Sequence, residues 1–173
     1  MNTRILVVLS LLVGIGAVLH TVVPPVLFGM KPDMLLAMMF LGILLFPQLK
    51  YVIILSITTG VISALTTGVP GGQISNLIDK PVTALLFLGL VLLLKDRVNG
   101  HIAAPVLTAI GTFISGTIFL SVALFLIGLL DGSFLALFTG IVLPAAAANT
   151  IIIAIVYPVA QRMAKRTRLQ VAS

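Results

Sequence analysis

Six apolar stretches follow one another along the chain, with few polar residues between them. They cover residues 5–23, 34–46, 51–67, 82–94, 102–130 and 134–160. A helix needs about 20 residues to cross the roughly 30 Å hydrocarbon core of a membrane, so four of these stretches are long enough on their own. The sequence therefore predicts an all-α membrane protein, with six transmembrane helices in a single domain that covers residues 1–173.

The composition excludes the soluble classes of protein. Of the 173 residues, 60% are hydrophobic and 8% are charged, whereas a soluble domain carries about a quarter charged residues. The net charge of +6 comes from ten Lys and Arg against four Asp and no Glu, so we interpret it as a signal of topology and expect no nucleic-acid partner. Cysteine is absent, which removes disulfides and thiolate sites. Membrane lipid is the expected surrounding.

The second and fourth stretches are too short to cross a membrane unaided. Each has thirteen residues, and thirteen helical residues reach only about 20 Å. We expect these helices to recruit the flanking residues 31–33 and 76–81. Charged side chains would thereby lie below the membrane surface.

The distribution of Lys and Arg in the short connections predicts the orientation. Eight of these residues fall on one side of the predicted bundle, and only Lys31 and Lys80 fall on the other. Positively charged connections stay on the inner side of the membrane, so we expect both termini to be cytoplasmic. His20 and Pro24-Pro25 stand where a signal peptide would need a cleavage motif, which predicts that the first stretch is retained.

Polar residues on the predicted outer side are candidates for function, because ionisable groups near a membrane are costly. Glycines and Pro70 within residues 68–72 are expected to break the third helix around a solute. Asn76, Asp79 and Lys80 are spaced i, i+3 and i+4 and would share one helix face. The candidate substrate-binding residues are Lys31, Asp33, Met34, Gln73, Asn76, Asp79, Lys80 and Asn149.

Each of these residues also has a structural interpretation. The outer charges could pair with one another or be solvated at the rim. Ser75 or Asn76 could cap a helix that begins there, and Asn149 could serve helix packing. A lone His20 at an interface is more typical of a hydrogen-bonded structural residue than of a proton carrier.

The pairing of opposite charges favours a small zwitterionic solute. Its carboxylate would bind Lys31 or Lys80, and its ammonium would bind Asp33 or Asp79. The sequence has no zinc-protease, intramembrane-protease or nucleotide-binding motif. We therefore predict no enzyme activity, no catalytic residue, no certain metal site and no cofactor beyond a coupling ion.

Without a nucleotide site, transport is expected to draw on an ion gradient. Asp79 is the candidate for taking up a proton or helping to hold a sodium ion, and the carbonyls of the broken helix from Thr66 and Thr67 to residue 72 are candidate further ligands. Alternatively, Lys80 neutralises Asp79 permanently, and uptake is facilitated diffusion.

Three segments together resemble a known family. Residues 29–34 with Lys-Pro-Asp, residues 60–81 with Asn-x-x-Asp-Lys-Pro, and residues 143–150 with Leu-Pro and Asn-Thr are similar to the small bacterial tryptophan transporters of the TrpP type. The resemblance covers essentially the whole chain. It implies uptake of L-tryptophan across the bacterial cytoplasmic membrane, and a fold similar to the S-components of energy-coupling-factor vitamin transporters.

Three functions from different classes remain open. We favour an autonomous secondary transporter with no obligatory protein partner. An S-component would need partner ATPases and a docking face on the first helix, where Ser10, Gly14 and Ala17 form only a sparse stripe of small residues. A structural or regulatory subunit is the third interpretation, and the membrane-depth charges Asp79 and Lys80 argue against it.

Overall fold

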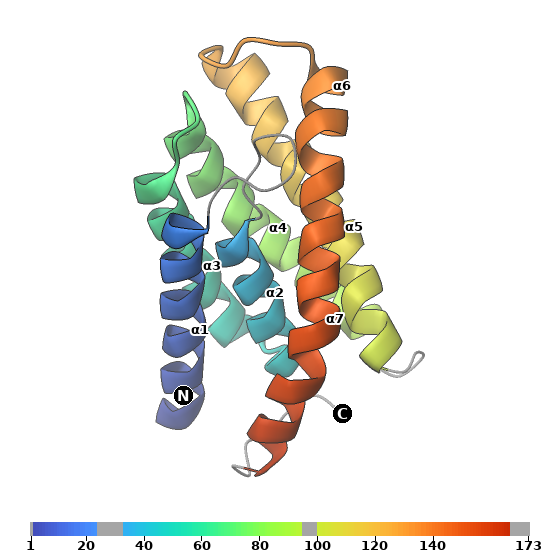
Figure 1. Ribbon diagram of the computed structural model, residues 1–173. Coiled ribbons are helices and arrows are strands. Elements are labelled where there is room, and N and C mark those ends of the chain that lie inside the picture. Colours follow the sequence, from blue (N-terminus) through green and yellow to red (C-terminus); the bar gives the residue numbers. More distant parts are fainter. Residues whose placement is uncertain (1, 24–32, 95–99, 167–173) are drawn as a thin grey trace.

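The computed structural model describes residues 2–23, 33–94 and 100–166, and these residues form a bundle of helices without strands (Figure 1). By length and composition, five of the helices can cross a membrane, which confirms the predicted all-helical, membrane-type architecture. The elements in chain order are α1 (Thr3–Val22), α2 (Met34–Leu45), α3 (Leu49–Thr66), α4 (Gly72–Leu94), α5 (Gly100–Ser121), η2 (Val122–Ile127), α6 (Phe134–Leu137), η3 (Phe138–Val142) and α7 (Leu143–Arg166).

The short helix α2 lies inside the bundle. Its 12 residues reach about 18 Å, and it contacts α1, α3, α4, α5 and α7. Of these residues, only Met34 is not fully buried. A helix that is apolar on all sides is stable only when protein or lipid surrounds it completely, and here protein does so. The other helices thus form a shell around α2.

The expectation that α2 gains length from residues 31–33 is wrong for Asp33. This residue is the N-cap of α2, where its side chain accepts a hydrogen bond from the backbone N–H of Leu36. An N-cap residue has a non-helical backbone, and its side chain satisfies a free N–H of the first turn. Residues 31 and 32 lie outside the described residues.

The expectation for the fourth span is confirmed. Helix α4 starts at Gly72, so it includes residues 76–81 and has 23 residues. The N-cap alternative for Ser75 and Asn76 is wrong, because both lie inside the helix, with side chains that donate to the carbonyls of Gly71 and Gly72. The buried face of α4 therefore carries its polar residues into the bundle.

The chain breaks between α3 and α4, as the glycines and Pro70 predict. Helix α3 ends at Thr66, and Thr67 follows with an extended backbone. The side chain of Thr67 accepts a hydrogen bond from the N–H of Val69. Gly71 has φ of +72°, a left-handed conformation that glycine adopts without a steric penalty. This turn brings α4 back along α3.

Helix α5 packs closely against η3, α2 and α4. A Cβ atom at Gly116 would collide with the side chain of Val142. One turn and a half earlier in α5, a Cβ at Gly111 would lie 2.7 Å from the Phe87 ring and 2.8 Å from the Phe40 ring. Those two rings are buried and stacked, with centroids 4.1 Å apart. Glycine therefore sets the spacing of these helices.

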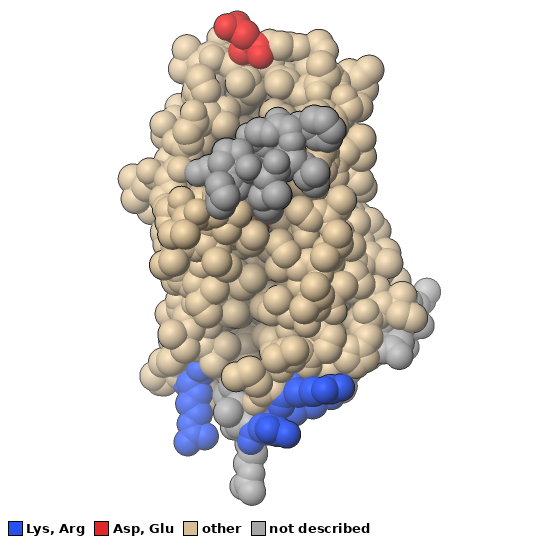
Figure 2. Space-filling model, in the orientation of Figure 1, with Lys and Arg blue, Asp and Glu red and all other residues tan. Residues whose placement is uncertain are grey.

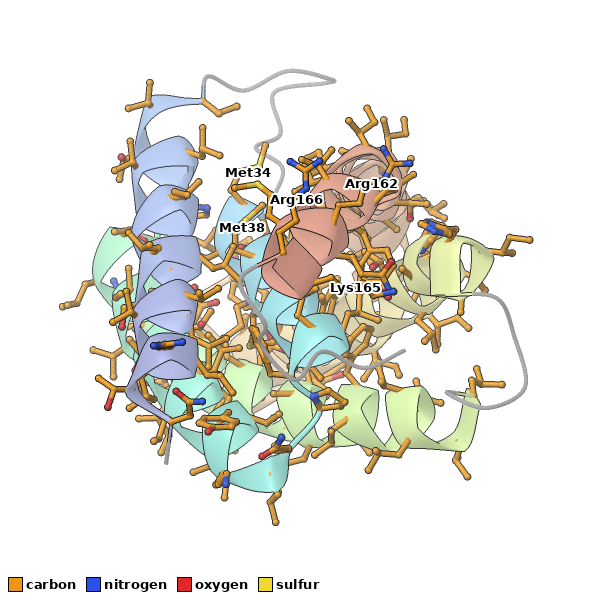
Figure 3. The ribbon with its side chains drawn as sticks, turned by 90° about the horizontal axis from the view of Figure 1, so that it is seen from below. Met34, Met38, Arg162, Lys165 and Arg166 are labelled. Carbon is orange, nitrogen blue, oxygen red and sulfur yellow. The ribbon has the colours of Figure 1, made fainter. Side chains whose placement is uncertain are left out.

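The exposed charges that the structure describes separate along the bundle axis. Arg4 is in the first turn of α1, Lys50 is in the first turn of α3, and Arg162, Lys165 and Arg166 are in the last turns of α7. Figure 2 shows basic atoms at the end where α1 begins and acidic atoms at the opposite end. Figure 3 views the bundle from the basic end, with the three basic residues of α7 labelled.

Candidate functional site

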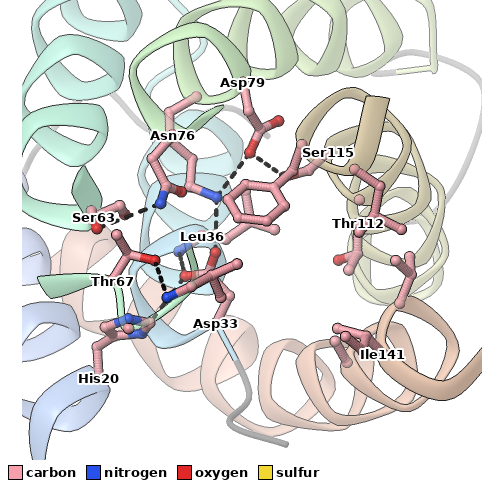
Figure 4. Close-up of a pocket in the computed structure, with 18 of the residues that line it drawn as sticks. His20, Asp33, Leu36, Ser63, Thr67, Asn76, Asp79, Thr112, Ser115 and Ile141 are labelled. Atoms are coloured by element: carbon pink, nitrogen blue, oxygen red, sulfur yellow. Dashed lines mark hydrogen bonds and ion pairs between the residues drawn. The ribbon is translucent and has the colours of Figure 1, made fainter. Parts of the chain in front are cut away.

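A cavity of about 520 Å³ lies in the half of the bundle away from the basic end. It is lined by residues near the end of α1, the start of α2 and the end of α3, together with parts of α4, α5, η3 and α7. Small-molecule sites enclose about 300 to 1,000 Å³, so a single amino acid fits this volume. Figure 4 shows the cavity with polar side chains from several helices around it.

Lys80 joins two carboxylates from different helices. Its Nζ atom lies 2.8 Å from Oδ2 of Asp33 and 2.9 Å from Oδ2 of Asp79. Lys80 is 2% exposed and Asp79 is fully buried, and buried charges are stable only when they are paired and hydrogen-bonded. These three side chains line the cavity, and with both carboxyl groups ionised they carry one net negative charge.

Asp79 is the fully satisfied member of this group. Its Oδ1 accepts a hydrogen bond from the Thr83 hydroxyl, and its Oδ2 accepts one from the Ser115 hydroxyl, both at 2.7 Å. Because Ser115 lies on α5, the carboxylate connects α4 to α5. Asp79 thereby fixes the position of the Lys80 ammonium.

Asp33 is the more accessible carboxylate. Its side chain is 26% exposed, and its Oδ1 caps α2 through the Leu36 N–H at 2.9 Å. Nδ1 of His20 lies 3.9 Å from that oxygen and has no hydrogen-bond partner within the described part of the chain. Asp33 and His20 both line the cavity, and each can form further hydrogen bonds.

The third polar wall comes from α3 and the start of α4. The Asn76 amide donates to the carbonyls of Gly72 at 2.9 Å and Ser63 at 3.4 Å. Asn76 is buried on the same face as Asp79 and Lys80, which confirms the predicted common face. Thr66 and Thr67 also line the cavity.

The structure places the remaining predicted residues elsewhere. Met34 is half-buried and Gln73 is exposed, and neither lines the cavity. Asn149 is fully buried behind the lining, where its Nδ2 donates to Thr112 Oγ1 at 3.3 Å. Lys31 lies outside the described residues.

Sequence reasoning missed the wall that α5 provides. Thr108, Thr112 and Ser115 are buried, and the last two line the cavity. Their spacing of i, i+4 and i+7 is a polar stripe on an otherwise apolar helix, which is the signal that could have revealed them. The apolar lining that was also missed comprises Phe119, Leu120, Leu130, Ile141, Val142 and Ala145.

The arrangement is suited to a small zwitterion. A Lys ammonium has three N–H donors, and Asp33 and Asp79 accept two of those of Lys80. The third can bind a carboxylate, while Asp33 can accept from an ammonium. Among the described residues, no three His, Cys, Asp or Glu side chains gather as a metal site.

Comparison with known proteins points to a single family for this chain. The model of the family described as "Tryptophan transporter TrpP" matches residues 2–165. A "Probable tryptophan transport protein" of Bacillus subtilis (strain 168) is 54% identical over 174 residues, which cover 100% of this chain and 99% of that protein. A protein of the same description from Clostridium acetobutylicum is 43% identical, with 91% of each chain covered.

A third relative, from Clostridium perfringens (strain 13 / Type A), has the same description and is 33% identical, with 97% of each chain covered. No solved structure matches the chain. The family match covers the described helices up to the next-to-last residue of α7, and it includes every residue that lines the cavity. The chain therefore belongs to the TrpP family of tryptophan transporters, which are membrane transport proteins and not enzymes.

Proposed function

We propose that this protein takes up L-tryptophan across the bacterial cytoplasmic membrane as an autonomous, ion-coupled secondary transporter. Family membership supports the substrate. The observation that carries the mechanism is the buried Lys80 between Asp33 and Asp79 in a cavity large enough for one amino acid. Charges at membrane depth are costly even when they are paired, and they commonly mark substrate or ion pathways.

The two ends of the amino acid bind different partners. The carboxylate of L-tryptophan accepts from the remaining N–H of Lys80, and its ammonium donates to the accessible oxygens of Asp33. The indole ring lies against the apolar lining from α5, η3 and α7. Asp79 holds Lys80 in place from behind and contributes through its charge.

The basic end of the bundle faces the cytoplasm, by the positive-inside rule. Both termini are then cytoplasmic, because α1 begins and α7 ends at that end (Figure 1). The cavity lies in the opposite, outer half. We therefore expect the cavity to receive its substrate from outside the cell.

The charge balance favours coupling to a cation. Two carboxylates face one ammonium, so a proton or a sodium ion would bring the group to neutrality. Asp79 is the candidate for holding this ion, and Asp33 is the second carboxylate within reach of Lys80. Thr66 and Thr67 line the same cavity, and their backbone carbonyls are candidate ligands for sodium.

One observation favours an S-component as the second candidate. Ser10 and Gly14 are exposed on α1, and a Cβ atom at Gly14 would meet nothing within 4 Å. This open surface of small residues would allow another helix to approach closely. In that case the protein binds tryptophan but needs a partner with ATPases to transport it.

Liposomes that contain the full chain as their sole protein separate these alternatives. Labelled L-tryptophan uptake is measured without a gradient, with an inward sodium gradient and with an inward proton gradient. We expect accumulation above equilibrium with one of the two ion gradients. Asp79→Asn should abolish accumulation, whereas the lipid-facing control Val82→Ala, at an exposed position on α4, should keep it.

The other outcomes each contradict a specific part of the proposal. Equilibration without accumulation under every gradient means facilitated diffusion, with Lys80 neutralising Asp79 permanently. Binding of tryptophan without any uptake indicates the S-component alternative. Absence of both binding and uptake overturns tryptophan as the substrate.

A further inference from the structure

The cavity has two chemically different sides. Charged groups from α2 and α4 form one side, and the apolar side chains of α5, η3 and α7 form the other. In Figure 4, Thr112 and Ile141 lie across the cavity from His20 and Asn76. A zwitterion bound at the charged side therefore directs its own side chain toward α5 and α7.

Two polar residues meet at the deep end of the apolar side. Thr112 precedes the lining residue Gly116 by one turn of α5, and Asn149 follows the lining residue Ala145 by one turn of α7. Because α5 and α7 run in opposite directions, both residues lie one turn closer to the basic end. Their side chains are in contact, since Asn149 Nδ2 donates to Thr112 Oγ1 at 3.3 Å.

The hydrogen bonds of this pair leave acceptors unused. The Thr112 hydroxyl donates its proton to the Thr108 carbonyl at 2.8 Å and accepts from Asn149 with one of its two lone pairs. Thr112 lines the cavity, and the described residues make no third hydrogen bond to its hydroxyl oxygen. Oδ1 of Asn149 is also buried without a hydrogen-bond partner in the described part of the chain.

We propose that Thr112 Oγ1 accepts the N–H of the substrate's aromatic side chain and so determines specificity for an indole. Asn149 is a positioning residue, because it holds the Thr112 oxygen between its own amide and the Thr108 carbonyl. A buried acceptor rejects a ligand that lacks the matching donor, since the acceptor then stays unpaired. This inference rests on the proposed binding of tryptophan.

The chain contains no tryptophan, so the indole fluorescence of a bound ligand can be measured without background from protein tryptophan. Purified full-length protein is titrated with L-tryptophan, and 3-benzothienyl-L-alanine competes for the site. This analogue has the same shape, but a sulfur atom replaces the N–H group. We expect the wild type to prefer L-tryptophan by about tenfold or more.

Three variants assign that preference to the pair. Thr112→Val removes the oxygen at nearly constant shape and should reduce the preference to about twofold or less by weakening only L-tryptophan. Thr112→Ser keeps the hydroxyl and should restore the preference. Asn149→Ala should also reduce the preference for L-tryptophan, as Thr112→Val does.

Thr108→Val is the matched control. Thr108 is buried one turn below Thr112, donates to its own helix and does not line the cavity. The substitution keeps the Thr108 carbonyl that Thr112 uses, so the ratio of affinities should stay at the wild-type value. Thermal melting in detergent checks that each variant is folded.

The possible failures are distinguishable. An unchanged preference in a folded Thr112→Val protein that binds L-tryptophan overturns the role of Thr112 and leaves the transport proposal intact. Equal binding of both ligands by the wild type also overturns the role of Thr112. A wild type that binds neither ligand overturns the transport proposal as well.

Discussion

At the scale of single residues, the charged group around Lys80 is asymmetric. Lys80 serves two carboxylates, so its removal leaves Asp33 and Asp79 facing each other. Removal of the Asp33 charge leaves the Lys80–Asp79 pair intact, and Asp33 is partly exposed. Loss of the Lys80 charge should therefore destabilise the fold far more than loss of the Asp33 charge.

We expect Lys80→Met to lower the free energy of unfolding by about 3 to 5 kcal/mol, because a buried carboxylate loses its partner. Asp33→Asn should cost at most about 1 kcal/mol, since a partly exposed ion pair contributes little and asparagine also caps helices. Thermal and denaturant unfolding in one detergent compares the two. Equal losses would contradict the assigned asymmetry.

At the scale of elements, the inner helix α2 depends on close contact with its neighbours. Gly111 on α5 lies against the stacked rings of Phe40 on α2 and Phe87 on α4. Both rings are fully buried, so they have no space to move away from an added methyl group. Gly89 on α4 is exposed, and a Cβ there meets nothing within 4 Å.

The same substitution at these two glycines should therefore have different effects. Gly111→Ala is expected to destabilise the bundle by about 1 to 3 kcal/mol through overpacking. Gly89→Ala should be neutral, or stabilising by up to about 1 kcal/mol, because alanine is the better helix former. Unfolding midpoints of both variants in detergent give the comparison. A stable Gly111→Ala protein would contradict the packing of α5 against α2 and α4.

At the scale of the whole molecule, charge separates along the bundle axis and the cavity lies at one end of that axis. Lys165 is exposed on the last turn of α7, and Asp131 is exposed in the connection before α6 at the other end. Because the chain has no cysteine, single cysteines at these positions can report the orientation.

A membrane-impermeant maleimide should label Asp131→Cys in intact cells and Lys165→Cys only after the membrane is permeabilised. This result follows if the basic end is cytoplasmic. The cysteine-free parent protein is the control for background labelling. The reverse labelling pattern would place the cavity on the cytoplasmic side and would contradict capture of substrate from outside.

The sequence by itself determined the local features of this protein. Hydrophobicity is a property of each segment, so the apolar stretches predicted the helices directly. Glycine and proline act on their own backbone, and they therefore predicted the break between α3 and α4. The i, i+3, i+4 spacing of Asn76, Asp79 and Lys80 predicted their common face, because helix geometry alone sets it.

The tertiary structure decided which residues share a cavity. Lys80 meets Asp33 across 47 positions of sequence, and Ser115 meets Asp79 across 36. Packing also encloses α2 within the bundle. Asp33 is the N-cap of this helix, although the length needed to cross a membrane suggested that the helix extends to residue 31. These contacts depend on how separate helices pack, and side-chain periodicity within one helix carries no information about the neighbour that it meets.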